Sequence, residues 1–158
     1  MNRIRLLLMS GILLPMLPGV VPAAVASDVA VVVQPNLPVD DLTFAELRKI
    51  LLGERQFWSS NVRVTMLIRA PVAHERDVVI KTIFQMTEAQ FRQYWISKVF
   101  RAESATSPKT VDTNEIAASL VSNIPGSIAF IDSTQVPKNL KVLRIDGRLP
   151  GEKGYPFN

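Results

Sequence analysis

The segment "VAVVVQP" (Val29 to Pro35) decides the fold class of this chain. Five apolar residues, four of them the β-branched valine, stand in a row, and a proline closes the segment. A strand buried on both faces of its sheet shows such an unbroken run, whereas a half-exposed strand alternates apolar and polar residues. The sequence therefore predicts an inner strand here, with helices packed on both faces of the sheet.

The residues that follow predict a loop, a helix and a second strand. The loop "PNLPVDDL" contains two prolines, which disfavour regular structure. Thr43 and Glu46 then form a capping box, and Gly53 is expected to end the helix in the left-handed conformation. "VRVTMLI" (Val62 to Ile68) is the predicted second strand. The expected core face of the helix comprises Phe44, Leu47, Ile50 and Leu51.

Further helices and the closing strands lie beyond residue 77. A second capping box, "TEAQ" at Thr87, predicts a helix whose core side carries Phe91, Trp95 and Val99. Asp112 and Glu115 repeat the spacing and predict a helix with Ile116, Leu120 and Val121 as its apolar residues. "PGSIAFID" and "LKVLRID" are typical of closing strands. This order predicts one α/β domain with a mostly parallel sheet of four or five strands and helices on both faces.

Residues 1–26 predict an export signal. Arg3 and Arg5 precede an apolar run, Leu6 to Val21, which is broken by prolines and is shorter than the roughly 20 residues that a bilayer span needs. Small residues then predict cleavage after Ala26, and the alternative is an uncleaved N-terminal anchor. The mature domain, Ser27 to Asn158, is expected in the periplasm without a membrane span.

Composition excludes several classes of function. Removal of the leader lowers the formal net charge from +4 to +2, and no arginine-rich run supports a nucleic-acid partner. The chain has no cysteine and one histidine, so neither a disulfide nor a metal site of histidines and thiolates is expected. The motif G-x-S-x-G is also absent, so we expect a non-enzymatic domain without a cofactor.

The junction "RAPVAHERD" (69–77) joins the second strand to a helical pattern and holds the only histidine. Arg69 ends a strand, which is where open α/β sheets place ligand residues. Arg76 is in line with the apolar stripe of the helix, so it is expected to reach a cleft or to pair with Asp112 or Asp132. His74 falls opposite that stripe and is either a ligand contact or an exposed first-turn residue.

Other polar residues are expected at the same edge of the sheet, just after strands or at helix starts. Such residues bind ligands, but they also serve as ordinary caps and turn formers. The four candidates are Asn36, Thr113, Asn114 and Ser127.

Several segments together resemble the phosphate-type periplasmic solute-binding proteins, which have the type II periplasmic-binding-protein fold. The stretch "VVVQPNLPVDDLTFAELRKILLGERQFW" is similar to the strand, loop and Leu-Thr-x-x-x-Leu-x-x-Ile-x-x-Gly helix of that family. "PGSIAFID" resembles its Pro-Gly-Ala-Ile-Gly-Tyr segment, and "VLRIDGRLPGEKGYPF" resembles its Asp-Gly-x-x-Pro ending. The resemblance covers residues 29–158 and implies a short branch with a single lobe, whereas full-length members have two.

The resemblance implies an altered anion site at the junction. In the family the strand ends in Arg-x-x-x-Ser-Gly-Thr-Arg, whose small residues close around an oxyanion at a helix N-terminus. Arg69 and Arg76 keep the outer positions, but Ala73, His74 and Glu75 replace Ser, Gly and Thr. The loss of both hydroxyls and the added negative charge imply a degenerate phosphate site.

Two functional hypotheses follow. The first is the substrate-binding component of a phosphate ABC transporter, which binds phosphate or another small oxyanion through Arg69, His74 and Arg76, joined by Asn36, Thr113 and Ser127. The second is an adaptor or sensor module that binds an envelope protein through the former cleft face. Monomer and homodimer both stay open. If each arginine pairs with an acid of the chain, the first hypothesis loses support.

Overall fold

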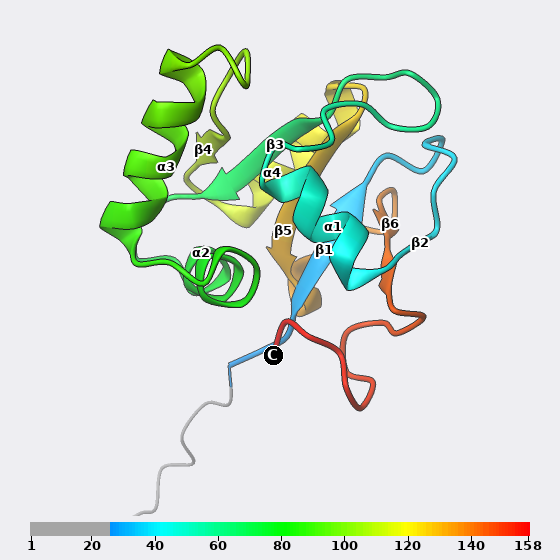
Figure 1. The fold of residues 1–158 in the computed structure, drawn as a ribbon. Coiled ribbons are helices and arrows are strands. Elements are labelled where there is room, and N and C mark those ends of the chain that lie inside the picture. The colour runs from blue at the N-terminus through cyan, green and yellow to red at the C-terminus, as the bar shows by residue number, and fades with distance from the viewer. Residues whose placement is uncertain (1–25) are drawn as a thin grey trace, which may run out of the picture.

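A computed structural model describes residues 26–158, so all but the last residue of the predicted leader lies outside it. The main sheet has five strands in the order β4-β3-β5-β1-β6 (Figure 1). Strands β2 and β7 form a second, smaller sheet. The main strands are β1 (Val29–Val33), β3 (Thr65–Arg69), β4 (Lys109–Val111), β5 (Ser127–Asp132) and β6 (Lys141–Val142). The helices are α1 (Phe44–Leu51), α2 (His74–Val79), α3 (Glu88–Phe100) and α4 (Asn114–Asn123).

Four of the five strands run in one direction. Strand β3 pairs in parallel with β4 and β5, and β1 pairs antiparallel with both β5 and β6. Only β1 is therefore reversed, and the predicted mostly parallel α/β sheet is confirmed. The predicted strand "LKVLRID" is divided, because β6 joins the main sheet while β7 (Arg144–Ile145) pairs with β2 (Asp41–Leu42).

Strand β1 separates two apolar cores. All five of its residues are buried, and they alternate between the faces of the sheet. Val29, Val31 and Val33 pack into the core shared with α1, α2 and α3, while Ala30 and Val32 pack into the core shared with α4. The unbroken apolar run thus correctly predicted a strand covered on both faces.

Local signals placed several helix ends correctly. Thr43 and Thr87 form the predicted capping boxes with Glu46 and Gln90, and Gly53 has φ +70° just after α1. The predicted cap at Asp112 is wrong: Thr113 caps α4, and its Oγ1 accepts a hydrogen bond from the backbone N–H of Ile116. Helix α2 continues directly into a short π-helix, η1 (Ile80–Phe84).

Two predicted core residues are exposed instead. Val99 is 41% exposed although Phe91 and Trp95 on the same helix are buried. Ile116 is 44% exposed, because α4 directs its small residues toward the sheet. Helical periodicity identifies an apolar face, but it does not say how far along that face the neighbouring elements extend.

The C-terminal segment packs against the start of β1. The backbone N–H of Val29 donates to the carbonyl of Phe157, and the hydroxyl of Tyr155 donates to the carbonyl of Val29. Both aromatic side chains are buried, and burial raises the pKa of the Tyr155 hydroxyl. Within residues 26–158, every helix is too short or too polar to cross a bilayer.

Candidate functional site

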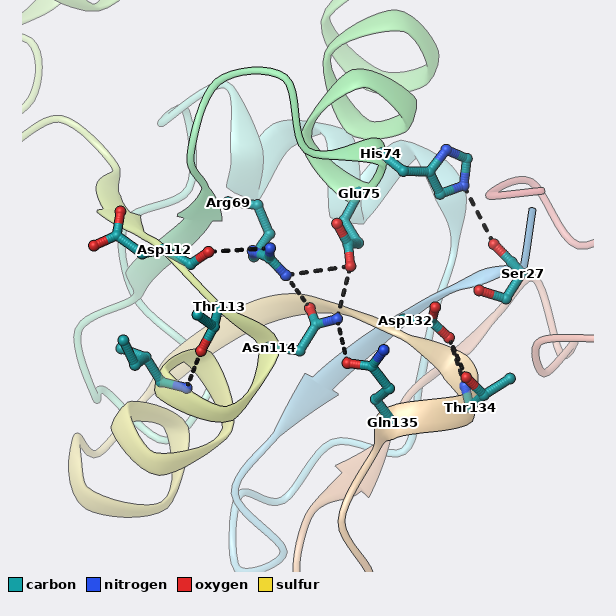
Figure 2. Close-up of polar contacts among 11 residues, drawn as sticks. Ser27, Arg69, His74, Glu75, Asp112, Thr113, Asn114, Asp132, Thr134 and Gln135 are labelled. Carbon is teal, nitrogen blue, oxygen red and sulfur yellow. Dashed lines mark hydrogen bonds and ion pairs between the residues drawn. The ribbon is translucent and has the colours of Figure 1, made fainter. Parts of the chain in front are cut away.

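The candidate site lies where strands β3, β4 and β5 end. Because these strands are parallel, their carboxyl ends meet at one edge of the sheet, which is the usual ligand position in open α/β folds. Arg69 ends β3, Asn114 begins α4 just after β4, and Asp132 ends β5. Figure 2 shows that Arg69, Glu75 and Asn114 point toward one another at this edge.

Two predicted site residues lie at the opposite edge. Ser127 begins β5 and pairs with Thr65 at the start of β3, and its buried hydroxyl donates to the carbonyl of Ile124. Asn36 follows β1, whose direction is reversed, and is exposed in a turn. The expectation that both share the edge with Arg69 is therefore wrong, since strand directions decide which chain ends meet.

Arg69 is neutralised within the chain. Its Nη1 donates to Glu75 Oε1 at 3.2 Å and to Asn114 Oδ1, and its Nη2 donates to the carbonyl of Asp112 at 3.1 Å. Asn114 Nδ2 donates in turn to Glu75 Oε1 and to Gln135 Oε1, each at 2.8 Å. Glu75 is 7% exposed, so its carboxylate acts as a buried counter-charge to Arg69 (Figure 2).

One donor in this network is unused. The Nε of Arg69 is buried and finds no acceptor among the residues that the structure describes. A buried N–H without an acceptor costs about 1–3 kcal/mol, so this donor is a local cost within the network.

Arg76 is also neutralised, but it points to a different place. Its Nε and Nη2 donate to the two carboxylate oxygens of Glu88 at 2.9 and 2.8 Å, and its Nη1 donates to the carbonyl of Arg69. Its guanidinium lies over the ring of Phe91 at 5.1 Å. The hydrogen bonds from Arg76 lower the pKa of the Glu88 carboxyl. The expected partners Asp112 and Asp132 are wrong, and Glu88 takes their place.

His74 is exposed and turns away from Arg69. Its Nε2 lies 3.3 Å from the carbonyl oxygen of Ser27. Nearby, burial alone would raise the pKa of the Asp132 carboxyl, but hydrogen bonds from Ser27 and Thr134 outweigh it and lower that pKa. Figure 2 shows that the contact between His74 and Ser27 is separate from the network of Arg69.

The remaining predicted residue, Thr113, caps α4 and is exposed. The structure therefore brings Arg69 and Asn114 together, and it adds two residues that sequence reasoning did not select, Gln135 and Glu88. Nothing in the sequence marked Gln135, because it lies in the short helix after β5, far from the junction. Within residues 26–158 no three acidic or histidine side chains gather closely enough to hold a metal ion.

The comparisons with known proteins agree with this architecture. No family model matches the chain. A phosphate ABC transporter substrate-binding protein from Clostridium perfringens, solved with bound phosphate, superposes with a TM-score of 0.61 at 18% identity over 77% of this chain. An ABC-type phosphate transport receptor from Vibrio cholerae gives 0.63 at 19% over 78%, and PstS from Borrelia burgdorferi gives 0.61 at 20% over 78%.

The chain spans about half the length of these solved structures, which it covers to 46%, 48% and 49%. It therefore has the fold of a single lobe of a periplasmic binding protein, as its sequence predicted. At these identities the likeness concerns the fold, so the ligands and partners of the solved proteins do not transfer with it.

Proposed function

We propose that this chain is an exported, non-enzymatic binding module whose inherited anion site is closed by its own Glu75, and which acts by binding a protein partner in the cell envelope. The observation that carries the proposal is the network of Arg69, Glu75 and Asn114. The carboxylate of Glu75 is paired with the guanidinium of Arg69, to which an oxyanion would otherwise bind.

Electrostatics opposes tight binding of phosphate at this edge. An anion that approached Arg69 would either displace the buried Glu75 carboxylate or lie beside it. Two like charges about 4 Å apart repel by about 4 kcal/mol at an effective dielectric constant of 20. A displaced Glu75 would also lose Arg69, the charged partner that it has within residues 26–158, while it stays in a buried position.

A second candidate function is binding of phosphate or another small oxyanion for an importer, by a monomer or a homodimer. The unpaired Nε of Arg69 and the fold shared with phosphate transport receptors favour it. Under this hypothesis Arg69 is the principal contact, with His74, Arg76 and Thr113 at the same edge of the sheet.

Isothermal titration with inorganic phosphate separates the two functions. We expect no heat from the wild-type protein at millimolar phosphate, and measurable binding by Glu75→Thr, which frees Arg69 and restores a hydroxyl. Asp77→Thr is the matched control, because Asp77 lies on the same helix but pairs with exposed Lys81. Micromolar binding by the wild type that is lost in Arg69→Gln would instead support the solute-binding function.

Export is tested separately. N-terminal sequencing of the protein recovered from the envelope should begin at Ser27. A protein that keeps residue 1 and sediments with membranes would indicate the uncleaved anchor.

A further inference from the structure

Strand β4 forms an open edge of the main sheet. Among the described residues it pairs only with β3, in the register Leu67 to Lys109, Ile68 to Thr110 and Arg69 to Val111. The carbonyl of Val111 accepts a hydrogen bond from the N–H of Ala70, so Val111 directs its backbone groups toward β3. Because alternate residues of a strand bond to opposite sides, the preceding residue, Thr110, directs its own N–H and carbonyl away from β3. An extended segment can add to such an edge through backbone hydrogen bonds.

An apolar groove lies beside this edge, lined by residues of α3, β4 and the segment between them. Figure 1 shows α3 and β4 at the same side of the sheet. Its volume is about 690 Å³, and most of its walls are apolar, including Phe91, Trp95, Ile96, Val99 and Phe100. Arg92 and the paired Arg76 and Glu88 also line it. Phe100 is 90% exposed and Ile96 is 62% exposed, which is unusual for large apolar side chains. The groove thus offers a large apolar surface at the side of the sheet.

A cationic pocket adjoins the groove near the start of β4, and Ser107 lines both. Three basic side chains line the pocket, Arg55, Arg63 and Lys109, and its lining contains no acidic residue. Phe57 orders two of them: Arg55 Nε donates to its carbonyl at 3.2 Å, and the guanidinium of Arg63 lies 4.8 Å from its ring centre.

Nearby acids leave these cations largely unneutralised. Glu46 lies close enough to Arg55 for a weak effect, but hydrogen bonds from Thr43 are the main cause of its lowered pKa. Glu103 contacts Lys98 and Arg101 instead. The pocket is therefore a concentrated positive charge at the end of an apolar groove.

We infer that the β4 edge, the apolar groove and the cationic pocket form one docking surface for an extended, acidic and apolar segment of a partner protein. This inference rests on the proposed adaptor function and names the surface that performs it. The segment adds to β4 through Thr110, places an apolar side chain in the groove beside Trp95, and directs a carboxylate at Arg55, Arg63 and Lys109.

Charge favours such a partner over a second copy of this chain. Pairing of two β4 edges across a two-fold axis would bring together two surfaces with the same excess of cations. Lysine and arginine side chains at an edge strand also oppose edge-to-edge association in general. An acidic segment, in contrast, is attracted by the pocket.

The test selects random short peptides displayed on phage against the full-length exported protein, followed by anisotropy measurements on a labelled peptide from the selection. We expect recovered peptides to combine acidic with aliphatic or aromatic residues. Substitution of Arg55, Arg63 and Lys109 by Gln should weaken binding at least about tenfold, equivalent to about 1.4 kcal/mol. Phe100→Asp should weaken it similarly.

Thr110→Pro tests the backbone part of the proposal. Proline is tolerated on an edge strand where its missing N–H faces outward, so the fold should persist while peptide affinity falls about tenfold. The matched control replaces the exposed cations Lys138, Arg148 and Lys153 by Gln, which should leave affinity unchanged. Thermal melting of each variant checks that it is folded.

Several results would overturn the inference. These are failure to recover any peptide, recovered peptides without acidic residues, or affinity that survives both the triple substitution and Thr110→Pro. Dimerisation in sedimentation analysis that Phe100→Asp abolishes would assign the face to a second copy. Phosphate binding lost in the Gln triple would assign the pocket to a small anion. All of these variants leave Arg69 and Glu75 intact, so the outcome is separable from the test of the proposed function.

Discussion

The two cation-bearing edges of this lobe differ in how their charge is balanced. Around β3 and α2, Arg76 is buried and Arg69 is largely covered, and each is paired with an acid of the chain. Beside β4, Arg55, Arg63 and Lys109 line a pocket without an acid. A buried charge must be compensated inside the fold, whereas an exposed one stays available to a partner. The positive charge that stays free of acids therefore lies beside β4.

The largest expected effect comes from Arg76→Ala. The change leaves Glu88 without its bidentate partner, the carbonyl of Arg69 without a donor and the ring of Phe91 without its cation. Removal of the buried Arg76 side chain loses its packing and leaves a carbonyl without a donor, which together cost about 3 kcal/mol. Urea denaturation should show this decrease in the free energy of unfolding.

The matched control for this variant is Arg148→Ala, at an exposed position away from Glu88. It removes the same type of side chain, and we expect a change below about 0.5 kcal/mol. If the two variants lose equal stability, the pairing of Arg76 with Glu88 does not stabilise the fold.

A smaller effect is expected from pH. Hydrogen bonds from Arg76 lower the pKa of Glu88 below its ordinary value of 4.5 in the folded state, so the unfolded chain binds the proton more readily. The stabilisation is complete above pH 4.5 and is lost as the pH falls through the lowered pKa. Because Glu88 is 36% exposed, solvent limits the contribution to less than about 1 kcal/mol.

The measurement is the free energy of unfolding from pH 7 down to acidic pH for the wild type and Glu88→Gln. The difference between them should shrink as the pH falls. A difference that is constant with pH would mean that the negative charge of Glu88 does not contribute to the free energy of unfolding.

The sequence predicted those parts of the fold that local chemistry determines. The capping boxes at Thr43 and Thr87 need only neighbouring residues, and the valine run of β1 reports burial on both faces directly. The reversed direction of β1 was not predictable in this way, because it depends on pairing with β5, about 100 residues away in the chain. That reversal is why Asn36 was assigned to the wrong edge.

The site was predictable to a similar extent. Arg69 and Glu75 lie six positions apart, so a strand-to-helix turn brings them together, and the possibility of their pairing was visible in the sequence. Gln135 and Glu88 come from other elements, and only the tertiary fold reveals their contacts. The groove beside β4 was missed because it depends on Val99 and Phe100 being uncovered, which periodicity does not report.

The smallest expected effect on stability comes from the three cations of the pocket beside β4. Replacement of Arg55, Arg63 and Lys109 by Gln should lower the free energy of unfolding by only about 0.5 kcal/mol, the lower end of the range for an exposed cation–π contact such as that of Arg63 with Phe57. Arg69→Gln, the control at the buried edge, should cost about 2 kcal/mol, because it leaves Glu75 buried without its charged partner. Both values come from urea denaturation. If the triple variant lost as much stability as Arg69→Gln, these cations would be needed by the fold itself and would not be a reserve of charge for a partner.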